Sequence, residues 1–182
     1  MKKISAILFV VAFASSMIFA QGALPQKGDK FVGGRLGLGS YGAGVGFGGG
    51  FELVTQNDFL NLGDIPASLG FGASVGYSTY KTGYWGGHWK YTNIVILGDV
   101  YYHADVLKNE KIDTFVKFSL GYNAGKVSYD GAYEDWYNEP THGGIVTGSA
   151  IGARYFFTPA LSAVAELGYG FGILRLGLDF AL

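Results

Sequence analysis

Cysteine is absent from this 182-residue chain, and only four prolines occur in it. The lack of cysteine excludes disulfide bonds, and it also excludes a bacterial lipoprotein, because lipid attachment requires a cysteine after the leader. Charged residues make up 15% of the chain and the net charge is −1, so there is no basic excess with which to bind nucleic acid. Helical periodicity is absent beyond residue 20. These absences argue against a disulfide-stapled, nucleic-acid-binding or helical protein.

Glycine and aromatic residues are abundant instead, with 31 glycines and an aromatic content of 16%. The glycines recur at every second position, as in Gly46, Gly48 and Gly50 and again in Gly70 and Gly72. Successive side chains of a strand point to opposite faces, so these glycines share one face of their predicted strands. The composition is not that of a disordered chain.

The N-terminus has the pattern of a secretory leader. Lys2 and Lys3 precede an almost wholly apolar run over residues 4–18, and Ala20 is a suitable last residue before cleavage. We therefore expect residues 1–20 to be a cleaved signal peptide. A transmembrane anchor is the alternative, but the run is short for a helix that must cross about 30 Å of hydrocarbon.

After a short lead at residues 21–30, residues 31–182 divide into eight predicted strands. The predicted strands cover residues 31–39, 45–54, 68–80, 91–104, 113–125, 144–157, 160–169 and 171–182. Most reach the length of about 9–11 residues that tilted membrane strands require. An even number of antiparallel strands can close on itself. The predicted fold is an all-β, eight-stranded, antiparallel, up-and-down transmembrane β-barrel.

The charged residues within these strands support a barrel with a polar interior. They are Arg35, Glu52, Asp99, Lys117, Arg154, Glu166, Arg175 and Asp179. All of them fall on the face that also carries glycine, serine and alanine, and none falls on the apolar face. Four are basic and four acidic, so we expect a neutral network in a narrow lumen, where buried charges must be paired.

Distances from the turns suggest which of these charges meet on neighbouring strands. The expected pairs are Asp99 with Lys117, Glu166 with Arg175, Arg154 with Glu166, Arg35 with Glu52, and Asp179 with Arg35 across the closure of the barrel. His103 lies on the same interior parity, and we expect it to be a satisfied interior histidine.

Aromatic residues collect near both ends of the apolar face. Tyr77, Tyr122 and Tyr169 mark one rim, and Tyr102, Tyr155, Phe157 and Phe180 mark the other. Such belts are typical of side chains at bilayer interfaces. A soluble lipocalin-like barrel would place the apolar face inside and the charges outside. That alternative is disfavoured, because a solvated face normally carries more charges than one or two per strand.

The C-terminal pattern Arg175-x-Gly177-x-x-Phe180-x-Leu182 resembles the β-signal of outer-membrane proteins. This resemblance implies recognition by the barrel-assembly machinery, although the terminal Leu182 stands where Phe or Trp is commoner. The segments PASLGFGASVGYSTY from Pro66, YTNIVILGDVYYH from Tyr91 and IGARYFFTPALSAVAELGYG from Ile151 are similar to the small outer-membrane β-barrel family that includes OmpX and the OmpA membrane domain.

The family resemblance implies the outer membrane of a diderm bacterium as location and outer-membrane lipid as partner. It also implies short periplasmic turns and longer external loops. The connections at 106–111 and 158–159 are then periplasmic, and those at 81–90 and 126–143 are external. The connection at 57–66 is longer than expected for a periplasmic turn. The family shares no catalytic motif, and we predict no enzyme activity, cofactor, metal or nucleic-acid partner.

The two long connections carry the candidate residues for a specific role. They are Tyr84, Trp85, His88 and Trp89 in the first and Tyr133, Trp136 and Tyr137 in the second. Exposed aromatic residues suit binding to an extracellular ligand. The same residues can instead pack on one another or touch surface lipid. We expect a plugged barrel that serves surface structure, adhesion or partner binding. A narrow channel for ions or small solutes is the alternative.

Two further kinds of site in these connections have weaker support. A lipid A-modifying site would use His88 or His142 with Glu134 or Glu139, but no serine lies close in sequence. A metal site at His88, Glu139 and His142 has no supporting ligand spacing.

Overall fold

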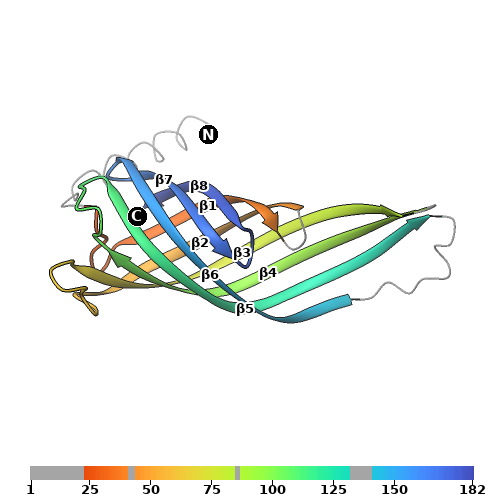
Figure 1. The fold of residues 1–182 in the computed structure, drawn as a ribbon, viewed down its shortest axis with the longest axis horizontal. Helices are drawn as coiled ribbons and strands as arrows, with labels where there is room; N and C mark the ends of the chain where they lie inside the picture. Colours follow the sequence, from red (N-terminus) through yellow and green to blue (C-terminus); the bar gives the residue numbers. More distant parts are fainter. Residues whose placement is uncertain (1–22, 41–43, 85–86, 132–140) are drawn as a thin grey trace, which may run out of the picture.

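The computed structural model of the protein describes residues 23–40, 44–84, 87–131 and 141–182. Within these ranges eight antiparallel strands follow one another in chain order and close into a barrel (Figure 1). The strands are β1 Lys30–Ser40, β2 Gly44–Asn57, β3 Ala67–Tyr84, β4 Gly87–Ala104, β5 Ile112–Gly131, β6 Thr141–Thr158, β7 Leu161–Tyr169 and β8 Leu174–Ala181. The predicted fold class is confirmed. The predicted signal peptide lies outside the described residues.

In the described ranges, no helix has both the length and the apolar character needed to cross a membrane.

The two faces of each strand differ as the residue parity predicts. Leu36 on β1 and Phe118 on β5 point outward and are more than half exposed, whereas Glu52, Arg154 and Glu166 point inward and are at most 2% exposed. A soluble barrel would have the opposite arrangement, so the lipocalin-like alternative is wrong for this chain. The exposed apolar belt requires an apolar surrounding, since water would not stabilise it.

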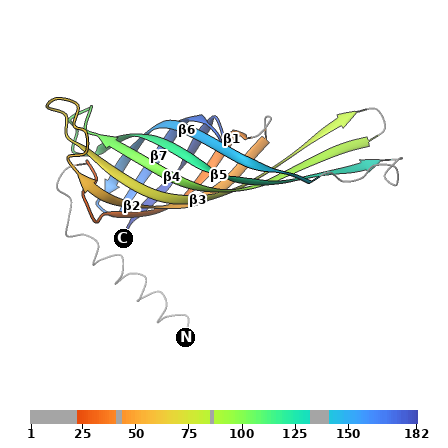
Figure 2. The same cartoon turned by 90° about the horizontal axis from the view of Figure 1, so that it is seen from below.

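Four strands extend beyond the others at one end of the barrel. β3, β4 and β6 have 18 residues and β5 has 20, whereas β7 and β8 have 9 and 8. Both views show this extension reaching past β1, β2, β7 and β8 (Figures 1 and 2). The prediction of loops at 81–90 and 126–143 was therefore partly wrong, because the described parts of both segments are mostly strand.

Aromatic packing explains why these segments continue as strands. The rings of Tyr80 and Tyr91 stack with centroids 4.6 Å apart, and those of Trp89 and Tyr129 lie 4.8 Å apart. Such pairs across neighbouring strands stabilise a sheet. The last strand is shorter than predicted. It begins at Leu174 and not at residue 171, because Gly170 and Gly172 adopt positive φ in the preceding turn.

The lead before β1 lies against the opposite end of the barrel, where the C-terminus is located (Figure 1). The Ser68 hydroxyl donates a hydrogen bond to the carbonyl of Pro25 at 2.8 Å. The amide of Gly28 donates to the carbonyl of Val54 at 2.8 Å, and the amide of Val54 donates to the carbonyl of Asp29 at 2.9 Å. The lead is therefore hydrogen-bonded to β2 and β3.

Candidate functional site

The interior of the barrel is crossed by charged side chains that form one connected network. Its first centre is Arg154 of β6, which is 1% exposed. The guanidinium contacts three carboxylates: Glu52 at 2.8 Å, Asp113 at 3.1 Å and Asp179 at 2.9 Å. The ring of Phe31 covers one face of the guanidinium, with its centroid 4.1 Å from Cζ. Arg154 therefore joins β2, β5 and β8 through the N–H donors of its planar guanidinium.

His103 of β4 lies fully buried beside this centre. Its Nδ1 is 3.0 Å from Asp113 and its Nε2 is 2.6 Å from Glu52. An ionised carboxylate only accepts hydrogen bonds, so two ionised acids at the two ring nitrogens match a ring that carries hydrogen on both. The structure therefore satisfies both nitrogens of His103 in the interior, between two acids.

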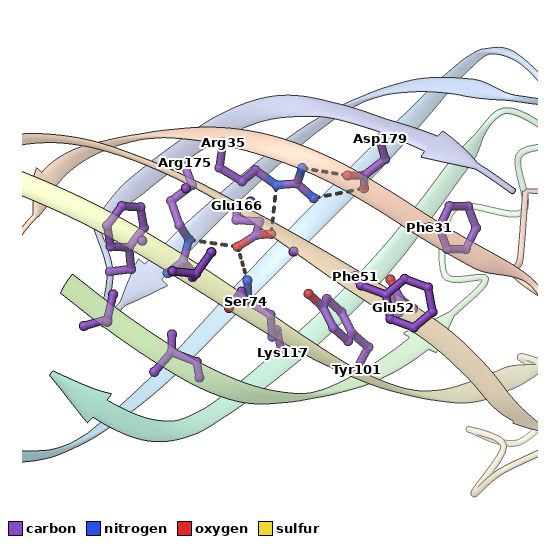
Figure 3. Close-up of a pocket in the computed structure, with 18 of the residues that line it drawn as sticks. Phe31, Arg35, Phe51, Glu52, Ser74, Tyr101, Lys117, Glu166, Arg175 and Asp179 are labelled. Atoms are coloured by element: carbon purple, nitrogen blue, oxygen red, sulfur yellow. Dashed lines mark hydrogen bonds and ion pairs between the residues drawn. The ribbon is translucent and has the colours of Figure 1, made fainter. Parts of the chain in front are cut away.

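The second centre is Glu166 of β7, where one carboxylate meets three cations. Lys117 lies 2.7 Å from it, Arg175 lies 2.8 Å from it, and Arg35 lies 3.4 Å from it (Figure 3). Arg35 also forms two hydrogen bonds to Asp179, at 2.6 and 2.9 Å. Because Asp179 contacts Arg154 as well, Arg35 and Asp179 connect the two centres into one network.

Two of the five pairs expected from the sequence are present, Glu166 with Arg175 and Arg35 with Asp179. The strand register places Glu166 directly opposite Arg175 on β7 and β8. Asp179 lies opposite Gly33, two residues from Arg35, and the long Arg35 side chain reaches across this offset.

The other three expected pairs are wrong because their side chains contact other partners. Lys117 lies opposite Tyr101, and Asp99 lies opposite Ser119, whose hydroxyl donates a hydrogen bond to it. Gly152, and not Arg154, lies opposite Glu166.

Arg35 and Glu52, the third of these pairs, lie four residues out of register. Glu52 lies opposite Phe31 on β1, and Arg35 lies opposite Gly48 on β2. Glu52 instead turns its carboxylate to His103 and Arg154.

Asp113 is the network member that the sequence reasoning did not select. It stands at the start of the predicted strand over residues 113–125, four residues before Lys117, so the interior parity of that strand would have found it. With Asp113 and His103 added to the eight predicted charges, five acidic and five basic side chains line the interior. Asp99 contacts Ser119, and the other nine form the connected network.

The interior glycines leave the space that these side chains occupy. A Cβ atom at Gly33 would lie 1.8 Å from Asp179 Oδ1, and one at Gly70 would lie 2.7 Å from Glu52 Oε1. At Gly177 it would lie 2.8 Å from Arg35 Cδ. The glycine repeats of the sequence are therefore required by close packing within a narrow lumen.

The residues that resemble the β-signal lie on both faces of the last strand. Arg175 points into the network, and Phe180 and Leu182 point outward and are exposed. Gly177 packs against the backbone of Gly34, where a Cβ would lie 1.9 Å from the carbonyl oxygen. Recognition of this strand by an assembly machinery stays a prediction.

The candidate residues of the long connections are placed only in part. His88 is exposed on β4, and Trp89 is half-buried against Tyr129. Tyr84 ends β3, and its side chain is outside the described structure. Trp85, Tyr133, Glu134, Trp136, Tyr137 and Glu139 lie outside the described residues, as does the side chain of His142. The predicted catalytic and metal-binding combinations are therefore not tested by the described residues.

Similar folds are found among solved structures. The N-terminal β-barrel domain of Pseudomonas aeruginosa OprF matches with a TM-score of 0.54 and 15% identity, over 89% of this chain and 100% of that chain. Ail, the attachment invasion locus protein of Yersinia pestis, matches with a TM-score of 0.50 and 12% identity, over 86% of this chain and 96% of that chain. This chain has the fold of a small outer-membrane β-barrel.

A de novo designed transmembrane β-barrel is also similar, with a TM-score of 0.49 and 17% identity, over 87% of this chain and 99% of that chain. No protein-family model matches the sequence, and no curated protein matches it. At these identities the likeness to solved structures concerns the fold. Function has to be argued from the interior network and from the extension.

Proposed function

We propose that the protein is an integral outer-membrane β-barrel with a plugged lumen, and that it acts through the sheet that extends beyond the membrane. The observation that carries this proposal is the contact between Glu52 and Arg154, because it joins β2 to β6. These strands lie opposite each other in the closed eight-stranded barrel. The network therefore crosses the whole lumen.

The space left within the network supports a plugged barrel. The interior cavity between Phe31, Arg35, Tyr101 and Phe171 measures about 40 Å³, which is room for a very few water molecules. A narrow channel, the alternative function, would need these paired charges to separate. Separation leaves buried charges without partners, which costs several kcal/mol per ion.

The extension supplies a surface for a partner. Its interior-parity face carries the packed rings of Tyr80, Tyr91, Trp89 and Tyr129. The opposite face carries exposed polar side chains, including His88 and Asp130, which the register places opposite each other. The described aromatic residues therefore hold the strands together, and the polar face is the one displayed.

The edge of the extension offers a second means of binding. The last pair between β2 and β3 is Val45 with Thr79, so residues 80–84 of β3 have no partner on that side among the described residues. An unpaired strand edge can accept a strand from another chain. Ail is by its name an attachment protein, and adhesion or partner binding is the surface role that we favour here.

Conductance in planar bilayers tests the plugged lumen. We expect the refolded protein to give no stable single-channel steps, because the network crosses the lumen. The double variant Glu52→Ala, Arg154→Ala should give more current than the unaltered protein, which verifies that inserted barrels are being measured. Stable, sizeable steps from the unaltered protein would overturn the plugged lumen and favour the channel.

Attachment of expressing cells tests the role of the extension. In one variant, residues 81–90 and 127–142 are each replaced by a short Asn-Gly turn. We expect cells with this variant to lose attachment to a panel of immobilised matrix proteins and polysaccharides, while the barrel still migrates as a folded species in unheated gels. Equal attachment by the truncated barrel would exclude the extension as the binding surface.

A further inference from the structure

Two turns at the C-terminal end of the barrel carry apolar side chains where polar ones are usual. The β2–β3 turn spans residues 58–66, and the β4–β5 turn spans residues 105–111. Leu60, Leu62, Val106 and Leu107 are each more than half exposed. The length of the first turn and these side chains have no role in the interior network.

The β2–β3 turn is fastened to the lipid-facing side of the barrel. Tyr102 has the outward parity of β4, and its hydroxyl donates a hydrogen bond to the carbonyl of Leu60 at 2.7 Å. Within the turn, Leu62 and Ile65 exchange two backbone hydrogen bonds at 3.1 and 3.2 Å. The amide of Ala67 donates to the side chain of Asn61 at 2.9 Å. These contacts pair part of the backbone of the turn, which lowers the cost of bringing its leucines toward lipid.

An apolar groove of about 520 Å³ lies beside these turns on the outer surface. Leu62 and Leu107 form one wall, Ala153 and Ala165 form the floor, and Leu167 and Leu174 form the far wall. The register pairs Ala153 with Ala165 on β6 and β7, so the small side chains stand in one row.

We infer that this groove binds an acyl chain of a phospholipid in the adjoining leaflet, covered by the leucines of the two turns. The inference rests on the proposed function, since it needs the barrel to lie in a membrane. The groove continues the lipid-facing belt, and a protein segment placed there would leave backbone N–H and C=O groups unpaired in hydrocarbon. An acyl chain has no such groups, and it gains close van der Waals packing against the groove.

Single-cysteine variants test the position of the turn, and the absence of native cysteine makes the labelling unambiguous. A nitroxide at Leu62→Cys in phospholipid vesicles should be accessible to oxygen and shielded from a water-soluble nickel chelate. A nitroxide at Asp64→Cys, which is exposed in the same turn, should show the reverse. Phe118→Cys on the lipid-facing side of β5 is the reference for membrane insertion.

The three labels separate failure of this inference from failure of the proposed function. Water exposure at Leu62→Cys with lipid exposure at Phe118→Cys overturns the inference alone. Water exposure at both positions overturns the membrane location as well. Lipid exposure at Leu62→Cys places the turn leucines where the groove requires them.

Retention of lipid tests the groove itself. Ala153→Leu fills the floor, and we expect it to reduce several-fold the phospholipid that stays bound in native mass spectrometry. Ala73→Leu makes the same change on the lipid-facing side of β3, outside the groove, and should retain lipid like the unaltered protein. Equal retention by Ala153→Leu and the unaltered protein would overturn the acyl-chain site.

Discussion

Arg154 and Glu166 are the two residues on which the interior depends. Arg154 is one cation among three carboxylates, and Glu166 is one carboxylate among three cations. A buried charge is stabilised only while its partners are present, so each centre holds several strands to one geometry. The network therefore acts as a set of cross-links between strands that are not neighbours.

Replacing Arg154 should destabilise the barrel strongly. Arg154→Ala leaves Glu52, Asp113 and Asp179 without their shared cation, and we expect a loss of about 3–5 kcal/mol in the free energy of unfolding. Arg154→Lys should be intermediate, since an ammonium cannot reproduce the guanidinium fork. Urea unfolding in detergent and heat-modifiability on gels measure the effect. Lys108→Ala, at an exposed turn position, is the matched control, and an unfolding midpoint for Arg154→Ala equal to that control would contradict the prediction.

Two adjacent glycines give a sharper comparison at the scale of one methyl group. Gly33→Ala would place its Cβ 1.8 Å from Asp179 Oδ1, whereas Gly34→Ala would place it no closer than 3.8 Å to another residue. We expect Gly33→Ala to cost about 1–3 kcal/mol through overpacking, and Gly34→Ala to be nearly neutral. Unfolding midpoints of the two variants, measured side by side, check this. Equal midpoints would mean that the lumen has more room than the structure shows.

At the scale of the elements, the extension has its own stabilising contacts. The rings of Trp89 and Tyr129 pack across β4 and β5, and Tyr129 also covers Gly87, where a Cβ would lie 2.2 Å from the Tyr129 hydroxyl. These contacts do not involve the interior charges. The extension should therefore open without unfolding of the barrel below it.

Removing the Tyr129 ring tests that independence. Tyr129→Ala should raise amide hydrogen exchange in residues 80–91 while leaving the exchange of β7 and β8 unchanged, because an aromatic pair of this kind contributes about 0.5–1.5 kcal/mol. Hydrogen exchange with mass spectrometry gives the readout for each segment. Ser128→Ala, at the neighbouring position on the opposite face, is the control. Faster exchange throughout the barrel would show that extension and barrel unfold as one unit.

At the scale of the whole molecule, the alternation of strands assigns each turn to one side of the membrane. Asp130 lies in the extension and Glu110 lies in the β4–β5 turn at the opposite end, and both are exposed. We expect Asp130→Cys to react with a membrane-impermeant biotin reagent on intact cells and Glu110→Cys to react only after lysis. The reverse pattern would show that the extension faces the periplasm.

The eight-stranded barrel and the polar lining of its interior could both be predicted from residue parity. Asp99, Arg175 and the other six charges that the parity selected all point inward, because alternation along a strand is a local property that needs no partner. Strand ends were harder to predict. The continuation of β4 to Gly87 depends on ring contacts between strands, which the pattern along one strand does not contain.

The sequence by itself determined which face of the barrel each side chain occupies, since that choice depends only on period-two alternation and on the cost of placing charge in lipid. Only the tertiary structure decided which charges meet. Register depends on turn geometry and on how the sheet closes, and these placed Glu166 opposite Arg175 but Arg154 opposite Val164. The lumen is also narrow enough for Arg154 to reach Glu52 on the far side. Such a contact arises from closure of the barrel, and the pattern of residues along either strand does not predict it.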